Sequence, residues 1–281
     1  MPKQCPHCGF KRAWKLRRSK LKCKKCRHEY SADNYLKVPG VRATEMQWRL
    51  CVRIFLRERT IKRIAQETGF CHCQIEKIVV HLRLAMLNDT PVPFRGTTEV
   101  DETYIGGQRK NKKLHIRRLE PGKKGHGTDK LPIIGIFNRD SKQVYVQVFD
   151  RKKKGWHTKY LKVFQIIKEH TVENSTIYTD SYPIYRSLAT YHPCHHQMIN
   201  HDKGEYSRGD LHTNNIEGFW GILKRKLGCI GGMKRENLKY FVAEITWRFN
   251  HNSLTYQEQE DELVRLVKQS WFGGRKQVLP F

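Results

Sequence analysis

The chain has 281 residues, enough for one large domain or for two to three small ones. Lys and Arg outnumber Asp and Glu by 54 to 27, so the net charge is +27, and nucleic acid is the usual polyanionic partner of such a chain. No apolar stretch approaches the roughly 18 residues of a membrane span, and the N-terminus lacks a signal-peptide pattern, so we expect a reducing compartment and no membrane contact.

Two cysteine pairs lie near the N-terminus. Cys5 and Cys8 form one C-x2-C pair, and Cys23 and Cys26 form another after fourteen intervening residues. Each pair can point two thiolates at one ion, so two pairs complete a tetrahedral zinc site, whereas redox cysteines usually occur as a single pair. A module this small buries little core, so structural zinc would supply its folding free energy. We predict a zinc ribbon over residues 1–35 with a basic surface that faces nucleic acid.

Residues 40–90 carry helical periodicity. Thr44 is a candidate N-cap for a first helix, whose apolar side we assign to Met46, Trp48, Leu50, Cys51, Ile54 and Phe55. A helix, a turn at Gly69 and another helix follow, with apolar residues spaced to face each other. This spacing predicts a helix-turn-helix-like DNA-binding segment, and a plain helical hairpin is the alternative. Cys71 and Cys73 are interpreted as core or turn residues.

A linker rich in proline, over residues 88–97, precedes a change of periodicity. The next part of the chain predicts three strands first and then alternating strands and helices, an order that matches a mixed α/β domain of the RNase-H-like type over residues 96–260. Residues 261–281 are interpreted as a C-terminal tail. The predicted fold class is thus a multi-domain α+β protein with a zinc ribbon, a helical segment and this α/β domain.

Two aspartates lie in or at the end of predicted strands of that domain. Asp101 lies in the first strand, and Asp180 ends the fourth. The first and fourth strands are neighbours in an RNase-H-like sheet, so the two carboxylates would lie side by side although 78 residues separate them. Close carboxylates repel unless a cation lies between them, and Mg²⁺ is the usual cation at such sites. Strand alternation turns Glu102 to the opposite side from Asp101.

A third acid lies in "HTNNIEGFWGILKR", residues 212–225. At 100° per residue, the apolar residues of this predicted helix form one buried face. Glu217 and Lys224 are seven apart and project together at the edge of that face, with the bare surface of Gly221 beside them. The carboxylate can therefore reach the strand-end aspartates, while Lys224 can hold a DNA phosphate. An ordinary exposed Glu beside a Lys is the alternative.

At this point the chain resembles the Merlin-type DDE transposases, including bacterial insertion-sequence transposases with an N-terminal zinc ribbon. The resemblance rests on "VDETYIGG", "IYTDSYPIY", "NHDKGEYSRGDLHTNNIEGFWGILKR" and "EITWRFN", which are distributed over residues 98–251. It implies that Asp101, Asp180 and Glu217 are the catalytic acids and that Lys224 is the basic residue seven positions after the Glu. Asn214 and its neighbour Asn215 are alternatives at the third acidic position, and we favour Glu217 because a carboxylate binds metal more strongly.

The resemblance implies a transposase that cleaves the ends of its element and transfers the strands to target DNA. Two Mg²⁺ or Mn²⁺ ions would be held by the three acids during phosphoryl transfer. The expected partners are the terminal inverted repeats, target DNA and a second copy of the chain, in a homodimer or higher oligomer. The expected location is cytoplasmic and nucleoid-associated if the source is bacterial, and nuclear if it is eukaryotic.

Further basic and polar residues are candidate contacts. Basic clusters in the chain predict DNA contacts that depend on salt and little on sequence, and the residues so assigned are Lys112, Lys113, Lys152, Lys153, Lys154, Lys224 and Arg225. His201, His212 and Asn214 are possible auxiliary residues that would orient phosphate or water. Solvated charge and ordinary surface histidines are the alternatives to these assignments.

Two other functions compete with the transposase. The first is a DNA-binding regulator that uses the zinc ribbon and helix-turn-helix and carries an inactive, domesticated body. The second is a nuclease of the same fold that cuts without joining. An intact trio of acids argues against the first, and only a strand-transfer assay separates the second from a transposase.

Overall fold

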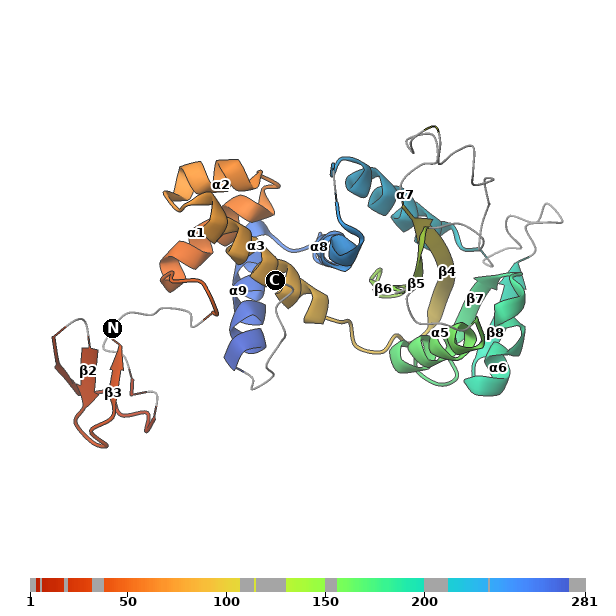
Figure 1. Cartoon of the computed structure of the whole chain (residues 1–281). Coiled ribbons are helices and arrows are strands. Elements are labelled where there is room, and N and C mark those ends of the chain that lie inside the picture. Colours follow the sequence, from red (N-terminus) through yellow and green to blue (C-terminus); the bar gives the residue numbers. More distant parts are fainter. Residues whose placement is uncertain are drawn as a thin grey trace. The chain divides into compact units, whose positions relative to one another are not determined.

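A computed structural model of the chain describes residues 4–5, 7–17, 20–31, 38–106, 114, 130–149, 156–199, 212–231 and 233–272. It divides into two compact units, which are described separately: unit 1 comprises Met1–Ala85 with Leu254–Phe281, and unit 2 comprises Met86–Ser253. The chain is a mixed α/β protein with two sheets (Figure 1). In the part that the structure describes, no helix has both the length and the apolar character needed to span a membrane.

The N-terminal part of unit 1 is a small antiparallel sheet in the order β1-β2-β3, formed by β1 (Ala13–Lys15), β2 (Lys20–Cys23) and β3 (Glu29–Ser31). Two similar turns precede β1 and β3. In each turn the residue after the second cysteine has a positive φ, 71° at Gly9 and 59° at Arg27. Its N–H donates to the carbonyl oxygen of the first cysteine, at 2.8 Å in one turn and 3.1 Å in the other. The two turns therefore bend the chain at each of the C-x2-C pairs that are predicted to point their thiolates at one ion.

The rest of unit 1 is helical, with α1 (Glu45–Leu56), α2 (Ile61–Thr68), α3 (His72–Asn88) and α9 (Tyr256–Phe272); unit 2 begins within the last turn of α3. Thr44 caps α1 through a reciprocal capping box with Gln47, which confirms the predicted N-cap. Gly69, with φ 74°, ends α2 in the left-handed conformation that glycine adopts at low cost. Cys71 is exposed just before α3 and Cys73 is exposed in its first turn, so neither cysteine belongs to the core.

The predicted apolar side of α1 was partly wrong. Met46 and Leu50 are 80% and 40% exposed, whereas Trp48 and Cys51 are buried as predicted. Met46 and Leu50 are four residues apart and lie on the side of the helix opposite Trp48 and its neighbours at 100° per residue. A prediction from hydrophobic character alone therefore puts both residues on the wrong side of α1.

Helix α9 covers most of the segment that the sequence suggested was a tail. Its apolar residues recur at helical spacing and are buried, namely Leu263, Val264, Leu266 and Val267. Glu260, 2% exposed, accepts hydrogen bonds from Arg49 and Arg53 of α1, at 3.3 Å and 2.9 Å. These hydrogen bonds hold α9 against α1.

Unit 2 is built on a sheet in the order β6-β5-β4-β7-β8, formed by β4 (Thr97–Ile105), β5 (Leu131–Asn138), β6 (Val144–Val148), β7 (Thr176–Asp180) and β8 (His195–Ile199). The pairs β4–β5 and β5–β6 are antiparallel, while β4–β7 and β7–β8 are parallel. The first strand of the unit therefore lies in the centre, beside the fourth. This confirms the predicted neighbourhood of the strands that carry Asp101 and Asp180.

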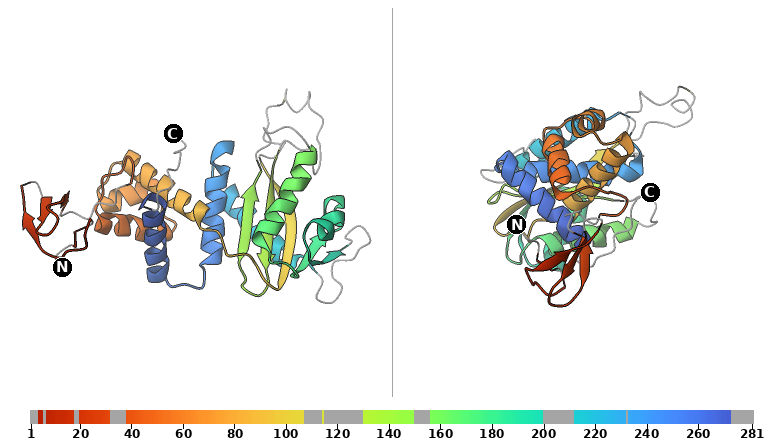
Figure 2. Two further views of the ribbon diagram at one scale, coloured as in Figure 1. Left: turned by 90° about the horizontal axis from the view of Figure 1, so that it is seen from below. Right: turned by 90° about the vertical axis from the view of Figure 1, so that its left-hand side faces the viewer.

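Helices cover both faces of this sheet (Figures 1 and 2). One face packs against α5 (Trp156–His170) and α6 (Leu188–Tyr191), and the other against α7 (Asn214–Gly228) and α8 (Leu238–Asn250). The predicted helix after Asp180 is a 3₁₀ turn, Pro183–Ser187, followed by the single turn of α6. A second 3₁₀ turn, Arg235–Asn237, precedes α8.

Candidate active site

Asp101 and Asp180 lie at equal levels on neighbouring parallel strands. The register pairs Val100 with Thr179, so the two aspartates follow one residue further along both strands. Side chains at equal levels point to the same face, and parallel strands are about 4.8 Å apart. Tyr182 donates its backbone N–H to Asp180 Oδ1 at 3.1 Å. The chain thus brings two carboxylates together on one face of the sheet.

Helix α7 brings Glu217 to the same face. The predicted buried side of the helix is confirmed, because Ile216, Phe219, Trp220, Leu223 and Leu227 are all at most 7% exposed. Glu217 is exposed at the edge of that side, and its Oε1 accepts a hydrogen bond from Thr213 Oγ1 at 2.9 Å. Glu217 thus lies at the edge of the buried side of α7, where the helical spacing predicts it.

Trp220 joins the helix to the first aspartate. Its Nε1 donates to Asp101 Oδ2 at 3.0 Å. Gly135 is the β5 partner of Asp101 in the sheet, and a Cβ at Gly135 would lie 2.6 Å from the Trp220 ring. Only glycine therefore leaves room for the indole beside Asp101. The helical pattern predicts that Trp220 is buried but does not predict its contact with Asp101. The signal of this close approach in the sequence is Gly135, a glycine within the apolar run "IIGIF".

The electrostatics of Asp101 reflect its neighbours. Burial raises the pKa of Asp101 from its ordinary value of 3.8 to about 7, and the negative charges of Asp180 and Glu217 add to the increase. The ligand oxygens of the three acids are not all within 4.8 Å of one another. A cation fits this arrangement, because bound positive charge would offset the repulsion from Asp180 and Glu217 that adds to the effect of burial on this pKa.

The neighbouring polar residues have other partners. Glu102 shares the strand face of Val100 and Tyr104 rather than that of Asp101, as alternation predicts, and Tyr104 Oη lies 3.5 Å from its Oε2. Arg139 Nη2 lies 2.9 Å from His212 Nδ1 and donates to the His212 carbonyl at 2.7 Å. Asn214 is exposed at the first position of α7. Among the described residues, the hydrogen bonds of His212 and Asn214 join them to Arg139 and to each other rather than to the three acids.

The four predicted thiols in unit 1 also meet. The Sγ atoms of Cys5, Cys8, Cys23 and Cys26 lie within 4.8 Å of one another. Cys5 and Cys26 are 3.6 Å apart, and Cys8 and Cys23 are 3.5 Å apart. Tetrahedral zinc with bonds of about 2.3 Å separates its sulfur ligands by roughly 3.8 Å. The cluster thus has the dimensions of a metal site.

The predicted DNA contacts fall in two groups. Lys224 and Arg225 are exposed on α7, with Lys224 two turns after Glu217. The other residues assigned to DNA contacts lie outside the described residues, namely Lys112, Lys113, Lys152, Lys153 and Lys154. The auxiliary candidate His201 also lies outside them.

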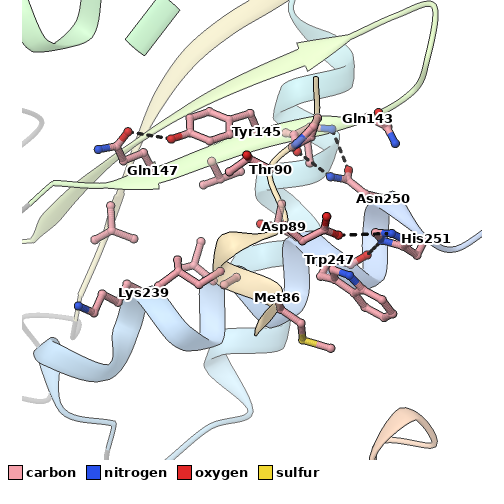
Figure 3. A pocket seen from close by; sticks show the side chains of 18 residues that line it. Met86, Asp89, Thr90, Gln143, Tyr145, Gln147, Lys239, Trp247, Asn250 and His251 are labelled. Carbon is pink, nitrogen blue, oxygen red and sulfur yellow. Dashed lines mark hydrogen bonds and ion pairs between the residues drawn. The ribbon is translucent and has the colours of Figure 1, made fainter. Parts of the chain in front are cut away.

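A cavity of about 370 Å³ lies elsewhere in unit 2, between the edge strand β6, α8 and the segment after α3 (Figure 3). The Asn250 amide bonds both backbone groups of Val144, at 2.8 Å and 2.9 Å. The Trp247 and His251 rings stack at 4.2 Å, and His251 lies 3.6 Å from Asp89. None of the three acids lines this cavity, so it is separate from the candidate active site.

The chain belongs to the family of the ISXO2-like transposase domain, whose model matches residues 93–250, more than half of the sequence. This range contains Asp101, Asp180 and Glu217, and it confirms the inferred membership in an insertion-sequence transposase family.

One curated relative and one solved structure are also similar. The relative is an uncharacterized protein in transposable element ISH50 of Halobacterium salinarum, 23% identical over 235 residues, with 80% of this chain and 76% of that protein covered. The structure is a chain of the simian T-cell lymphotropic virus intasome in complex with PP2A regulatory subunit B56 gamma. It has a TM-score of 0.35 and 14% identity, and the match covers 74% of this chain and 69% of that chain. A similarity this low carries no argument about fold or function.

Proposed function

We propose that the protein is a DNA transposase that cleaves the ends of its element and joins them to target DNA. The observation that carries the proposal is the convergence of Asp101, Asp180 and Glu217 on one face of the sheet, where burial, with added repulsion from the other two acids, raises the pKa of Asp101 to about 7. Membership in a transposase family supports the same function. We further propose that the β6-β5-β4-β7-β8 sheet with helices on both faces is an RNase-H-like domain.

The three acids would hold two Mg²⁺ or Mn²⁺ ions. When bound, such ions activate the attacking oxygen and neutralise charge on the leaving oxygen of a phosphodiester. Asp101 and Asp180 would hold their carboxylates at a fixed spacing because both lie in paired strands. Glu217 would complete the site from α7, its side chain oriented by Thr213. Asn215 is a weaker candidate for the third position because its side-chain amide donates to Glu99 at 2.7 Å.

The reaction would have two displacements of the same kind. In the first, water attacks a phosphorus at the element end, the P–O3′ bond breaks, and a 3′-hydroxyl is released. In the second, that hydroxyl attacks a phosphorus of target DNA, so one P–O bond forms as another breaks and no external energy source is needed. Lys224, exposed two turns after Glu217, would hold a phosphate of the bound strand.

Unit 1 would supply DNA recognition. We propose that the four-cysteine cluster binds structural zinc and that α2 and α3 form a helix-turn-helix that contacts the terminal repeats. Because two element ends must be cut together, the active form would be a homodimer or higher oligomer on DNA. Its location would be the compartment that holds the DNA.

The test is a cleavage and strand-transfer assay. Purified protein is incubated with a labelled DNA fragment that carries its element end, with Mg²⁺ or Mn²⁺, and the wild type is compared with Asp180→Asn. We expect the wild type to nick and join the end, and the variant to bind equally while doing neither. If both proteins bind and neither cuts with any metal, the protein is a DNA-binding regulator. Cutting without joining would identify a nuclease.

A further inference from the structure

Glu99 is a buried carboxylate two residues before Asp101 on β4. Its side chain is 0% exposed, and it accepts hydrogen bonds through both oxygens. Oε1 accepts from Arg139 Nε at 2.6 Å and from Asn215 Nδ2 at 2.7 Å. Oε2 accepts from the backbone N–H groups of Asn215 and Ile216, both at 3.0 Å. A burial this complete is compensated by charge and hydrogen bonds together.

These bonds cap helix α7 from a distant strand. The first N–H groups of a helix lack partners within the helix, and the side chain of Thr213, which precedes α7, does not cap it. Glu99 satisfies two of these groups and places negative charge at the positive end of the helix dipole. Arg139 completes the junction, because its guanidinium also bonds His212 just before the helix.

A second contact fixes the same two elements one turn further along. Trp220 of α7 donates to Asp101 of β4, and Asp101 lies on the same strand face as Glu99 because the two are two residues apart. Two strand residues span about 7 Å, and the four helix positions from Ile216 to Trp220 span about 6 Å. Strand and helix are therefore matched in length between the two contacts, and Glu217 lies between them.

We propose that Glu99, with Arg139 as its partner, is a positioning residue that sets the place of Glu217 relative to Asp101 and Asp180. It acts through the backbone of α7 and does not touch the reacting DNA. The inference rests on the proposed function, since it assigns Glu99 a role in building the metal site of the three acids.

The test measures Mn²⁺ binding by the full chain, with structural zinc retained, alongside DNA cleavage. Glu99→Gln keeps the shape of the side chain but removes its charge and replaces one acceptor with a donor. Glu260→Gln is the matched control, because Glu260 is also a buried acid with two arginine partners, in unit 1. We expect Glu99→Gln to raise the Mn²⁺ concentration at half-saturation about tenfold or more and Glu260→Gln to leave it unchanged.

Loss of stability alone would give a different result. If folded Glu99→Gln binds Mn²⁺ with the wild-type midpoint, Glu99 only stabilises the fold and the proposal is overturned. If Glu99→Gln does not fold, Glu99→Asp, which keeps the charge and shortens the reach, decides the question by the same midpoint. A wild type that neither binds Mn²⁺ nor cleaves DNA would instead contradict the proposed function.

A separate observation concerns the outer face of the ribbon sheet. Trp14 of β1 is 47% exposed, and its cross-strand partner is Lys22. Lys24 Nζ lies 5.7 Å from the centre of the Trp14 ring. The neighbouring residue Ala13 pairs with Cys23, which is fully buried, so alternation turns Trp14 away from the thiol cluster. The result is an exposed aromatic ring beside Lys24 and beside Lys22, which also lies 3.6 Å from Glu29.

The geometry points to single-stranded DNA as the occupant of this face. An exposed indole offers a stacking surface to a base, and a base offers its ring face only where it is unpaired. The described ribbon residues include nine Lys or Arg and one acid, Glu29. This excess of positive charge complements a phosphate backbone. We propose that Trp14 stacks on an unpaired base while Lys22 and Lys24 contact neighbouring phosphates. This inference extends the DNA-binding role proposed for unit 1.

The test is the affinity of the full chain for labelled oligothymidine over a range of salt concentrations. Trp14→Phe keeps an aromatic ring, and Trp14→Leu keeps apolar bulk without one. We expect near wild-type affinity for the first and a roughly tenfold loss for the second. The salt dependence should stay unchanged in both, while Lys24→Ala should reduce it. Zinc content checks that each ribbon is folded.

Equal affinities of Trp14→Phe and Trp14→Leu would overturn the stacking proposal. So would binding of element-end duplex by a wild type that does not bind oligothymidine. A wild type that binds neither DNA would contradict the DNA-binding role itself.

Discussion

The substitution Asp101→Asn should stabilise the protein when no Mg²⁺ or Mn²⁺ is added. Burial, together with the charges of Asp180 and Glu217, raises the pKa of Asp101 from 3.8 to about 7. A carboxyl whose folded-state pKa exceeds its unfolded-state pKa costs no stability below the unfolded value. The cost grows as the pH rises from about 4 to about 7 and is complete above that, because the folded state must then hold an unfavourable charge.

The size of the effect follows from the same values. At about 1.4 kcal/mol per pKa unit, the increase corresponds to roughly 4 kcal/mol at most, and the partial solvent access of Asp101 reduces it to about 2–4 kcal/mol. Asparagine removes the charge but keeps an oxygen that can accept the bond from Trp220. We expect Asp101→Asn to be more stable than the wild type by this amount at pH 8 and by little at pH 4.

The assay is urea unfolding read by hydrogen exchange of β4 and β5 peptides, which reports on unit 2. The buffer contains no added divalent cation, and structural zinc is left in place. The control is Glu236→Gln, an exposed acid before α8, which should show no such pH dependence. Added Mg²⁺ should stabilise the wild type more than Asp101→Asn. A variant less stable than the wild type at pH 8, or a difference that does not change with pH, would refute the electrostatic reasoning.

Three further outcomes are expected. Gly135→Ala should destabilise unit 2 by about 1–3 kcal/mol in chemical denaturation, because its Cβ would lie 2.6 Å from Trp220, whereas Gly218→Ala meets no atom within 4 Å and should be neutral or stabilising. Cys23→Ser should abolish stoichiometric zinc binding, measured by elemental analysis, and leave the unfolding of unit 2 unchanged. Glu260→Gln should destabilise unit 1 by about 1–2 kcal/mol, measured by denaturation, because the buried side chain loses its charged hydrogen bonds with Arg49 and Arg53.

The sequence predicted those features that depend on local pattern and strand order. Asp180 was predictable because it ends a short β-rich run, and Asp101 because it lies within another. The pairing of their strands followed from the order of strands and helices in the chain, and the register confirms it. The buried side of α7 was predictable because its apolar residues recur at the helical period. The four cysteines were recognisable from their spacing alone.

Contacts between distant residues were not predictable in the same way. Glu99 reads as one more acid in a strand, and its partner Asn215 is 116 residues away. Nothing local distinguishes an acid that caps a distant helix from one that faces solvent. The contact of Trp220 with Asp101 likewise depends on the room left by Gly135, which only the assembled sheet reveals. Met46 was misassigned because one exposed apolar residue looks the same in sequence as a buried one.

The central claim is that the acids of unit 2 hold the metal ions of DNA cleavage, and a change of metal preference tests it most directly. A thiolate binds Mn²⁺ better than Mg²⁺, so Asp180→Cys should be inactive on labelled element ends with Mg²⁺ and regain part of its cleavage activity with Mn²⁺. Asp180→Asn, the control, should recover far less with either ion. Cleavage by Asp180→Cys at the wild-type rate in Mg²⁺, or no difference between the two variants in Mn²⁺, would contradict the assignment of Asp180 to the metal site.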